Sequence, residues 1–369
     1  MATPLELALK QTQLNPLHKA LGAKMVEFGG WEMPVEYSGI IQEHLAVRRA
    51  AGLFDVSHMG EVEVRGPGAL ALLERVTCNE VSRLEDFQAQ YNALMHPRGT
   101  AVDDCIVHRL AADHYYLCVN AANTERDFEW ILSHRCEEAE VKDVSGEYAQ
   151  LALQGPRSTE IISKVTEASV EGLKYYWFCP ARCCGVDGLL ARTGYTGEDG
   201  FEFYFPPAAS ERVWNTLLEA GRPVGLVPAG LGARNTLRLE AGYALYGHEL
   251  NDDTTLLEAN LGWIVRLEKG EFLGRSVLLE QRRLGTRKKL VGFEMTGPGI
   301  ARDGQTVFAN GERCGAVTSG SYAPFLKKSI GLAYVSPALA EVGREIEVEI
   351  RGKRVGARIV SLPFYRRPT

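Results

Sequence analysis

Apolar and polar positions follow both helix and strand periodicities over the first 280 residues. Residues 60–65 alternate, with Val62 and Val64 on one face and charged side chains on the other, as expected of a half-buried strand. Apolar residues at helical spacing predict helices over residues 38–51, 70–76, 124–132, 213–220 and 233–241, and an apolar run predicts a buried strand over 115–119. This mixture predicts an α+β region.

The pattern changes over the last part of the chain. Ile346, Val348 and Ile350 alternate with glutamates, and further strands are predicted over 290–295 and 355–360. The pair Asn310-Gly311 is a strong hairpin signal, because both residue types tolerate positive φ. These features predict a β-barrel or roll. The expected division is therefore an α+β region at 1–280, a linker at 281–289 and a β-barrel domain at 290–369. The linker is basic, and binding of an acidic partner is the less favoured interpretation of its charge.

Composition narrows the function classes. The chain has 369 residues, of which 45% are hydrophobic and 24% are charged, with a net charge of -6. A mildly acidic chain is not typical of a nucleic-acid-binding protein. No apolar run reaches the ~18 residues of a membrane span, and the start lacks the order of a signal peptide. A cytoplasmic protein with no membrane or nucleic-acid partner is expected, or a mitochondrial matrix protein if a transit peptide was removed.

Cysteine spacing argues against a metal centre. The chain contains eight cysteines and no C-x-x-C pair. Zinc sites and disulfide frameworks favour tighter spacing. We therefore predict reduced, mostly buried thiols and no metal site.

The run Arg192–Glu202 contains candidate binding chemistry. Its glycines require a tight, irregular turn, and the strand that follows places Phe201 and Phe203 on one face and Glu202 on the other. A carboxylate on a rigid strand accepts two parallel N–H bonds, which suits an amidine-like ligand edge such as that of a reduced pterin. The alternative, an ordinary hairpin with an exposed glutamate, is favoured by spacing alone.

Two further segments carry charged residues at special positions. A glycine-rich turn before residue 233 opens a helix, and Arg234 lies in its first turn, where an anionic group would bind. A capped structural helix is the simpler interpretation. Asp103 and Asp104 interrupt an apolar strand, and adjacent strand residues face opposite ways, so they do not form a catalytic dyad. An acid among apolar neighbours has a raised pKa that suits proton handling. The alternative is an exposed turn just before the strand.

A hydrolytic triad is not indicated. Asp55, Ser57 and His58 are neighbours in sequence, whereas triads assemble from distant segments. No G-x-S-x-G elbow is present. The segment around these residues is expected to line a pocket.

Several motifs occur together in one order along nearly the whole chain. They are Phe28-Gly29-Gly30-Trp31-Glu32-Met33-Pro34, Phe54-Asp55-Val56-Ser57-His58-Met59, Val119-Asn120-Ala121-Ala122-Asn123, Arg192–Glu202, Gly230–Gly242 and Thr318-Ser319-Gly320. In this order they resemble the glycine cleavage system T-protein family, the aminomethyltransferases. The resemblance implies an α+β cloverleaf of three domains around a central folate channel, with two interleaved α+β subdomains and a C-terminal β-barrel.

The resemblance also implies a reaction. Members of the T-protein family transfer the one-carbon unit of an aminomethyl group to tetrahydrofolate. The aminomethyl group is carried on the dihydrolipoyl arm of the H-protein. The products are 5,10-methylenetetrahydrofolate and ammonia. Tetrahydrofolate is thus the expected co-substrate and lipoylated H-protein the expected protein partner, without a metal.

Site residues follow from the motifs. Asp104 matches the catalytic acid, Glu202 the pterin-binding carboxylate and Arg234 a folate-contacting arginine. Other matches to pocket positions are Met59, Tyr91, Asn120, Tyr195 and, more weakly, Tyr243; Arg366 is a candidate contact to the folate tail. The chain departs from the family pattern in the loop His96–Thr100 before the acid pair, and at Asn235, where the family has Asp.

Two other functions fit parts of the pattern. One is a stand-alone folate-dependent demethylase of the same superfamily, although no flavin fingerprint is present. The other is a non-catalytic folate-binding module, whose cysteine-containing signature is missing around residues 245–249.

Overall fold

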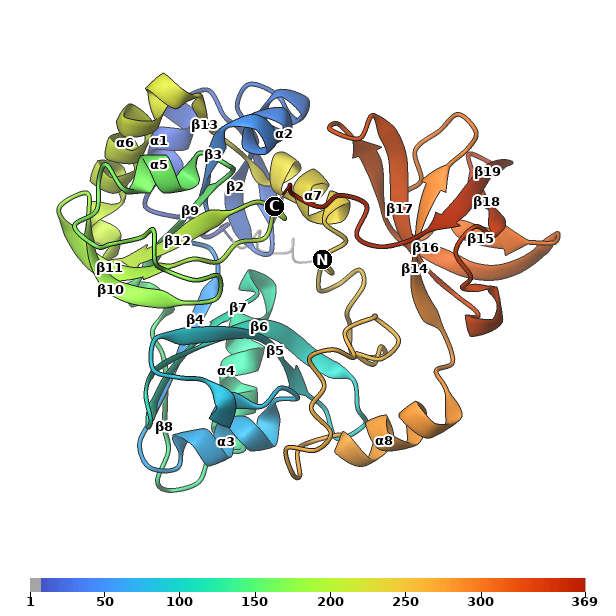
Figure 1. Cartoon of the computed structure of the whole chain (residues 1–369), viewed down its shortest axis with the longest axis horizontal. Coiled ribbons are helices and arrows are strands. Elements are labelled where there is room, and N and C mark those ends of the chain that lie inside the picture. The colour runs from blue at the N-terminus through green and yellow to red at the C-terminus, as the bar shows by residue number, and fades with distance from the viewer. Residues whose placement is uncertain (1–7, 369) are drawn as a thin grey trace, which may run out of the picture.

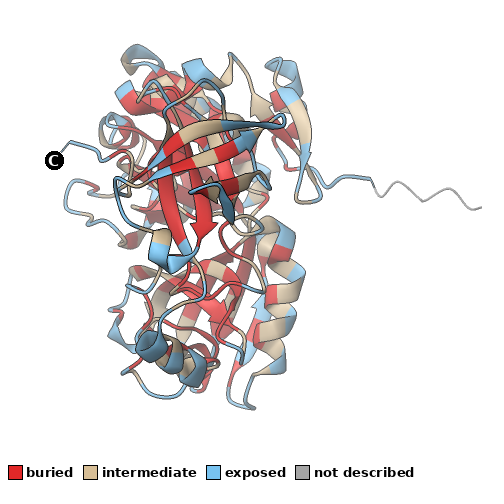
Figure 2. Ribbon diagram, turned by 90° about the vertical axis from the view of Figure 1, so that its right-hand side faces the viewer, coloured by how far each residue is buried: buried red, intermediate tan, exposed pale blue. Residues whose placement is uncertain are grey.

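The chain builds three lobes, each around its own β-sheet (Figure 1). The computed structural model describes residues 8–368. Buried residues are concentrated on the strands, whereas loops and outer helix faces are largely exposed (Figure 2). Each lobe therefore has a core of its own.

The first lobe contains a six-stranded sheet in the order β10-β11-β12-β9-β3-β13. Its strands are β3 (Ala51–Asp55), β9 (Ala149–Gln154), β10 (Phe178–Cys183), β11 (Val186–Ala191), β12 (Gly200–Phe205) and β13 (Leu226–Pro228). Its helices are α1 (Asn15–Ala20), α2 (Ile40–Arg49), α5 (Ser158–Ile162), α6 (Ser210–Gly221) and α7 (Leu231–Glu240), and β1 (Lys24–Phe28) and β2 (Trp31–Glu36) form a hairpin beside it.

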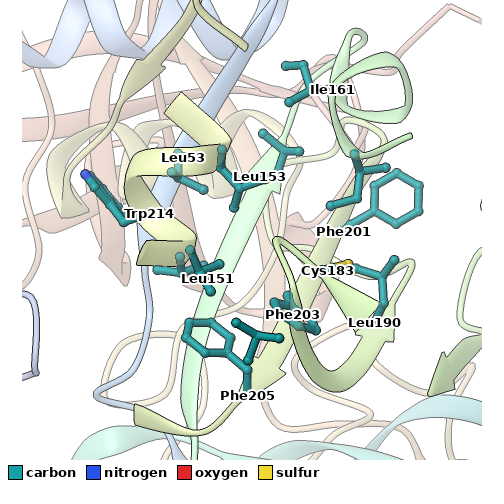
Figure 3. Packing of buried hydrophobic residues seen from close by; sticks show 14 of the residues in the cluster. Leu53, Leu151, Leu153, Ile161, Cys183, Leu190, Phe201, Phe203, Phe205 and Trp214 are labelled. Carbon is teal, nitrogen blue, oxygen red and sulfur yellow. The ribbon is translucent and has the colours of Figure 1, made fainter. Parts of the chain in front are cut away.

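Strand alternation divides the first lobe's core into two layers. Leu53 and the three phenylalanines of β12 pack with Trp214 of α6 on one face of the sheet (Figure 3). On the other face Phe54 packs against α2 and α7. The phenylalanine face predicted from the sequence is therefore core, and Glu202 lies on the opposite face, toward the second lobe.

The second lobe contains a five-stranded sheet in the order β5-β6-β7-β4-β8. Its elements are β4 (Gly60–Arg65), α3 (Ala69–Val76), β5 (Gln88–Met95), β6 (Ala101–Ala111), β7 (His114–Val119), α4 (Thr124–Ser133) and β8 (Glu140–Asp143). Helices α3 and α4 supply Leu72, Leu73 and Ile131 to its core. Four predicted elements are confirmed, with ends that agree within one residue: the strands at 60–65 and 115–119 and the helices at 70–76 and 124–132.

The chain leaves the first lobe after β3, completes the second lobe, and returns to the first with β9. The two α+β subdomains are therefore interleaved, as the resemblance implied. Residues 241–284 then cross back over the second lobe, where Leu250 and Ile264 pack with Ala93 and Met95 of β5. Helix α8 (Arg275–Leu284) ends this crossing, so the first part of the segment 281–289, expected as a linker, is helical.

The third lobe is a closed six-stranded barrel in the order β14-β17-β16-β15-β18-β19. Its strands are β14 (Lys289–Met295), β15 (Thr306–Ala309), β16 (Glu312–Ala323), β17 (Lys328–Val335), β18 (Glu345–Ile350) and β19 (Lys353–Val360). The predicted barrel is confirmed. Helix α7 joins it to the other lobes: Arg238 Nη1 lies 2.9 Å from Glu249 Oε2, and Arg238 Nη2 donates to Ser319 Oγ at 2.8 Å.

The predicted hairpin turn joins β15 to β16, with Asn310 at φ 53° and Gly311 at φ 84°. Replacing Gly311 by Ala is expected to destabilise this hairpin by about 1 kcal/mol, because the left-handed conformation costs an L-residue about 1–2 kcal/mol. A Cβ at this position meets nothing within 4 Å, so conformational strain alone is tested. Hydrogen exchange of the β15 and β16 amides measures the change. In the control Gly146→Ala, the Cβ also meets nothing within 4 Å and no positive φ is involved. Equal protection in both variants would contradict the expectation.

Candidate active site

The two α+β sheets face one another. The buried cluster between them takes Tyr116 and Cys118 from the second lobe and Phe178 and Tyr204 from the first. Glu202 shares the face of Tyr204 on β12, and on β6 Asp104 shares the face of Ile106, which packs against the same cluster. Because side chains two apart on a strand point the same way, both carboxylates face the space between the lobes.

Asp104 is held by two donors. The hydroxyl of Tyr91 donates to Oδ2 at 2.9 Å, and the amide of Asn120 donates to Oδ1 at 3.0 Å. Burial, together with the negative charge of Asp103, raises the pKa of Asp104 to about 7. Asp104 is therefore a fixed carboxyl group that changes charge near neutral pH.

Asp103 faces the opposite side of β6. It accepts from the backbone N–H of Asn120 at 3.0 Å and from the side-chain amides of Asn120 and Asn123 at 2.9 and 2.8 Å. Strand alternation assigns the two aspartates to opposite faces of β6, yet the Asn120 side-chain amide donates to both, at 2.9 and 3.0 Å. Both lie within β6, so the alternative of an exposed turn before the strand is wrong.

Glu202 is only 8% exposed, so the alternative of an exposed hairpin glutamate is wrong. Thr193 Oγ1 donates to one carboxylate oxygen at 2.5 Å, and Gln150 Nε2 donates to the other at 3.2 Å. Burial raises the pKa of Glu202, whereas the Thr193 bond, the charge of Arg234 and the Gln150 bond oppose that rise. Each oxygen keeps a lone pair for a further donor.

Arg234 lies in the first turn of α7, as predicted. Its guanidinium carbon lies 4.7 Å from the centre of the Tyr195 ring, which stacks on Tyr243 at 5.8 Å. The Tyr195 hydroxyl donates to the carbonyl of Ala244. The side chain of Asn235 accepts a hydrogen bond from Arg238 Nε at 2.9 Å. The departure at Asn235 thus bears on Arg238 and the α7–barrel junction.

Tyrosines connect the two charged groups. Tyr176 is half-buried; desolvation raises its pKa, and the negative charges of Glu202 and Asp104 add to that rise. Desolvation and the negative charge of Asp104 raise the pKa of Tyr195, and the positive charges of Arg238 and Arg234 oppose that rise. The charges of Asp104, Glu202 and Arg234 therefore act on half-buried tyrosines of the same region.

Met59 and Arg366 lie differently. Met59 is half-buried and packs against the clusters around Phe54 and Tyr204, beside this region. Arg366 is exposed and lines a separate cavity of about 980 Å³. That cavity is also lined by Arg48, which pairs with Glu198, by Arg192 and Arg367, which pair with Asp199, and by Tyr175 and Phe325. Tyr175, in the lining of this cavity, contacts Tyr176 edge to face with the ring centres 4.8 Å apart.

The loop at residues 96–100, which departs from the family pattern, is held in place by contacts to Asp252. His96 Nε2 lies 3.2 Å from Asp252 Oδ1, and Arg98 donates to the Asp252 backbone carbonyl at 2.9 Å. This loop precedes β6 and so fixes the start of the strand that carries Asp104.

The local triad is absent, as expected. Asp55 accepts from Thr12 at 2.7 Å and lies 2.9 Å from His18, so it has no bond to His58. Burial, and then the charge of Arg234, lowers the pKa of His58 to about 4. His58 is therefore neutral at physiological pH.

Sequence reasoning missed four contributors to this region. Thr193 and Gln150 hold Glu202, Tyr176 lies near enough to both carboxylates for their charges to raise its pKa, and Trp263 stacks on Tyr91 at 6.0 Å while remaining 60% exposed. Thr193 lies inside the glycine-rich run Arg192–Glu202. The tight turn that these glycines require was a sign that neighbouring polar side chains are held in fixed positions. The other three belong to apolar or loop segments without any local sign of function.

Comparison with known proteins identifies the relatives. Residues 14–269 match the GCVT N-terminal domain, and residues 288–366 match the glycine cleavage T-protein C-terminal barrel domain. The chain is 52% identical to an aminomethyltransferase of Acidobacterium capsulatum over 100% of this chain and 99% of the relative. It is 52% identical to an aminomethyltransferase of Moorella thermoacetica over 98% of this chain and 99% of the relative.

A solved structure agrees with this assignment. The glycine cleavage system aminomethyltransferase T of Bartonella henselae superposes with a TM-score of 0.91 at 34% identity, covering 97% of this chain and 98% of that one. Fold and matches together define an enzyme of the aminomethyltransferase class. The chain belongs to the glycine cleavage T-protein family. Across residues 8–368, none of the helices has the length and apolar character needed to span a bilayer.

Proposed function

We propose that this chain transfers the one-carbon unit from aminomethyl-dihydrolipoyl H-protein to tetrahydrofolate, with release of ammonia and formation of 5,10-methylenetetrahydrofolate. The observation that carries the proposal is the placement of Asp104 and Glu202 on facing sheets, with Arg234 against the Tyr195 ring and its charge acting on Glu202. The full-length aminomethyltransferase relatives support it.

Glu202 suits the pterin. The ring N–H and amino group of a reduced pterin form a two-donor edge, and a carboxylate accepts two parallel bonds from such an edge. Thr193 and Gln150 fix the carboxylate before the ligand arrives. Tyr195 and Tyr243 offer stacked aromatic faces, and Met59 an apolar one, for the ring system. Preorganisation of this kind reduces the free-energy cost of binding.

Asp104 suits the part of the site where the folate nitrogen reacts. Tyr91 and Asn120 leave the carboxyl one orientation, from which it positions the attacking folate nitrogen and stabilises the positive charge that develops. Positioning of the two substrates supplies most of the acceleration. The anionic form is the one that stabilises this charge.

The anionic form predicts a pH dependence. Since the pKa of Asp104 is raised to about 7, kcat is expected to rise through neutral pH and level off above it. Initial rates across pH with saturating substrates measure this. The rise of kcat with pH, the acidic limb of the profile, should be absent in Asp104→Asn, because position 104 then carries no titrating group. A wild-type rate that falls through the same range would contradict the assignment.

The proposal is tested by mixing the protein with tetrahydrofolate and with lipoylated H-protein that carries the aminomethyl group derived from glycine. Ammonia and 5,10-methylenetetrahydrofolate are expected in equal amounts. H-protein without lipoate is the matched control and should give neither product. A demethylase would instead use sarcosine or dimethylglycine as donor. Turnover of those amines with none of aminomethylated H-protein would reject the proposal.

The cavity beside Arg366 suits the glutamate tail of the folate. Arg366→Ala is expected to raise KM for tetrahydrofolate about two- to fivefold with kcat unchanged, because exposed ion pairs contribute about 0–1 kcal/mol. Steady-state kinetics with tetrahydropteroate, which lacks the tail, gives the control. The substitution should leave KM for that substrate unchanged. An equal rise for both substrates would contradict a tail contact.

A further inference from the structure

A buried carboxyl group lies behind the acid pair. Asp127, on α4, is completely buried, and neither of its carboxyl oxygens has a hydrogen-bond donor among the described residues. The chain on either side brings it to Asp103: its neighbour Arg126 donates to the backbone carbonyl of Val102, and Asn123, one helical turn earlier, donates to Asp103 Oδ1 at 2.8 Å. The nearest cation, Arg126, has its Nε 3.9 Å from Asp127 Oδ1 and makes no hydrogen bond to it through that nitrogen.

Two ionised carboxylates do not remain in contact inside an apolar core. Burial of an unpaired charge costs several kcal/mol, and a group in that position takes up a proton instead. Asp103 already accepts three N–H bonds from Asn120 and Asn123, which stabilise its anionic form. Asp127 has no such bonds, so the proton belongs on Asp127.

We propose that Asp127 is a positioning residue: it carries a proton, donates it in a hydrogen bond to Asp103, and so keeps Asp103 anionic behind Asp104. Asn120 transmits the effect, since its side-chain amide donates to Asp103 Oδ1 at 2.9 Å and to Asp104 Oδ1 at 3.0 Å. The anionic Asp103 fixes that amide. The amide in turn fixes the carboxyl group that contacts the substrate.

Charged and titratable groups face this pair from several neighbouring elements. On α4 there is Arg126, and beyond it Asp252. On β6 there are Asp103, Asp104 and Cys105, on β5 there is Tyr91, and from the first lobe Tyr176 and Tyr195 feel the charge of Asp104. Burial raises the pKa of Asp127 far above its ordinary value, and the negative charge of Asp103 raises it further. The geometry and these charges agree on a neutral Asp127.

Two substitutions separate this role from a structural one. Asp127→Asn keeps the shape and supplies an N–H for Asp103, so turnover and its pH profile should stay within about twofold of wild type. Asp127→Leu removes the donor. It should lower kcat about tenfold with little change in KM, because the Asn120 amide and Asp104 lose their fixed orientation. Its acidic limb should also move to lower pH, since Asp103 takes the proton and no longer raises the pKa of Asp104. Glu129→Leu, exposed on the same helix, is the control.

A spectroscopic measurement decides the inference without the reaction. Above the titration of Asp104, the spectrum of the wild-type protein minus that of Asp127→Asn should show the infrared carbonyl band of one protonated carboxylic acid. Buried Glu61, whose pKa is also raised by burial, contributes equally to both proteins and cancels in the difference. Absence of the band from the difference spectrum, equal losses in Asp127→Asn and Asp127→Leu, or wild-type kinetics in Asp127→Leu would each overturn the proposal. If Asp127→Leu does not fold, Asp103→Asn replaces it, and its acidic limb should move down by about one pH unit; an unmoved limb would also overturn the proposal.

The kinetic tests rest on the proposed function, whereas the infrared band does not. Failure of the H-protein assay in wild type with the band present would reject the proposed function and leave the protonated Asp127 standing.

Discussion

Replacing Asp104 with Asn should lower kcat by about 10²- to 10⁴-fold, the range usual for loss of a positioned acid–base group, with a far smaller change in KM for tetrahydrofolate. The amide matches the carboxyl group in size and keeps an acceptor for Tyr91. It carries no negative charge, so it cannot stabilise positive charge on the reacting nitrogen. Because this stabilisation exists only in the transition state, kcat and kcat/KM should fall together.

Stopped-time assays of ammonia and 5,10-methylenetetrahydrofolate with saturating H-protein measure the fall in kcat. Asp113→Asn is the matched control, since Asp113 is exposed in the turn between β6 and β7. It should behave as wild type. Unchanged turnover in Asp104→Asn would remove Asp104 from the mechanism, and a loss confined to KM would make it a binding residue.

The sequence predicts the local features of this fold well. Asn310 and Gly311 adopt the positive φ angles that their residue types suggest, and the strand alternation after Gly200 places the phenylalanines in the core. In both cases the structure is decided by residues adjacent in the chain. The barrel and the helices follow from the same kind of information.

Convergence across the lobes is a different matter. Periodicity assigns Asp104 and Glu202 each to one face of a strand, but it does not say that the two faces meet. Their meeting depends on the chain leaving the first lobe after β3 and returning with β9, a long-range topology that the resemblance supplied. For the same reason the spacing alone favoured an exposed Glu202, which is in fact buried.

Asp127 shows what a closer inspection of the pattern would have found. It lies one helical turn before Ile131, on the face of α4 that packs into the second lobe. A charged residue on an otherwise buried helical face is a signal, because such a group requires a partner or a proton. The identity of that partner, Asp103 on β6, requires the folded structure.

Replacing Glu202 with Gln should raise KM for tetrahydrofolate about 100-fold, which corresponds to about 3 kcal/mol, with kcat at saturation nearly unchanged. The carboxylate has two oxygens to accept the two pterin donors, and the amide replaces one acceptor with an N–H that opposes a donor. Hydrogen bonds to charged groups contribute about 1.5–3 kcal/mol each, and a buried donor left unpaired costs about as much again. The loss therefore falls on binding.

Calorimetric Kd values for tetrahydrofolate test this without H-protein. Glu147→Gln, exposed in the turn before β9, is the control and should bind as wild type does. An unchanged Kd in Glu202→Gln would show that the pterin edge lies elsewhere, even if Asp104→Asn had lost its turnover. A weaker Kd with kcat preserved, beside the opposite result for Asp104, would assign the two facing carboxylates to separate tasks: Glu202 to holding the ring and Asp104 to the chemical step.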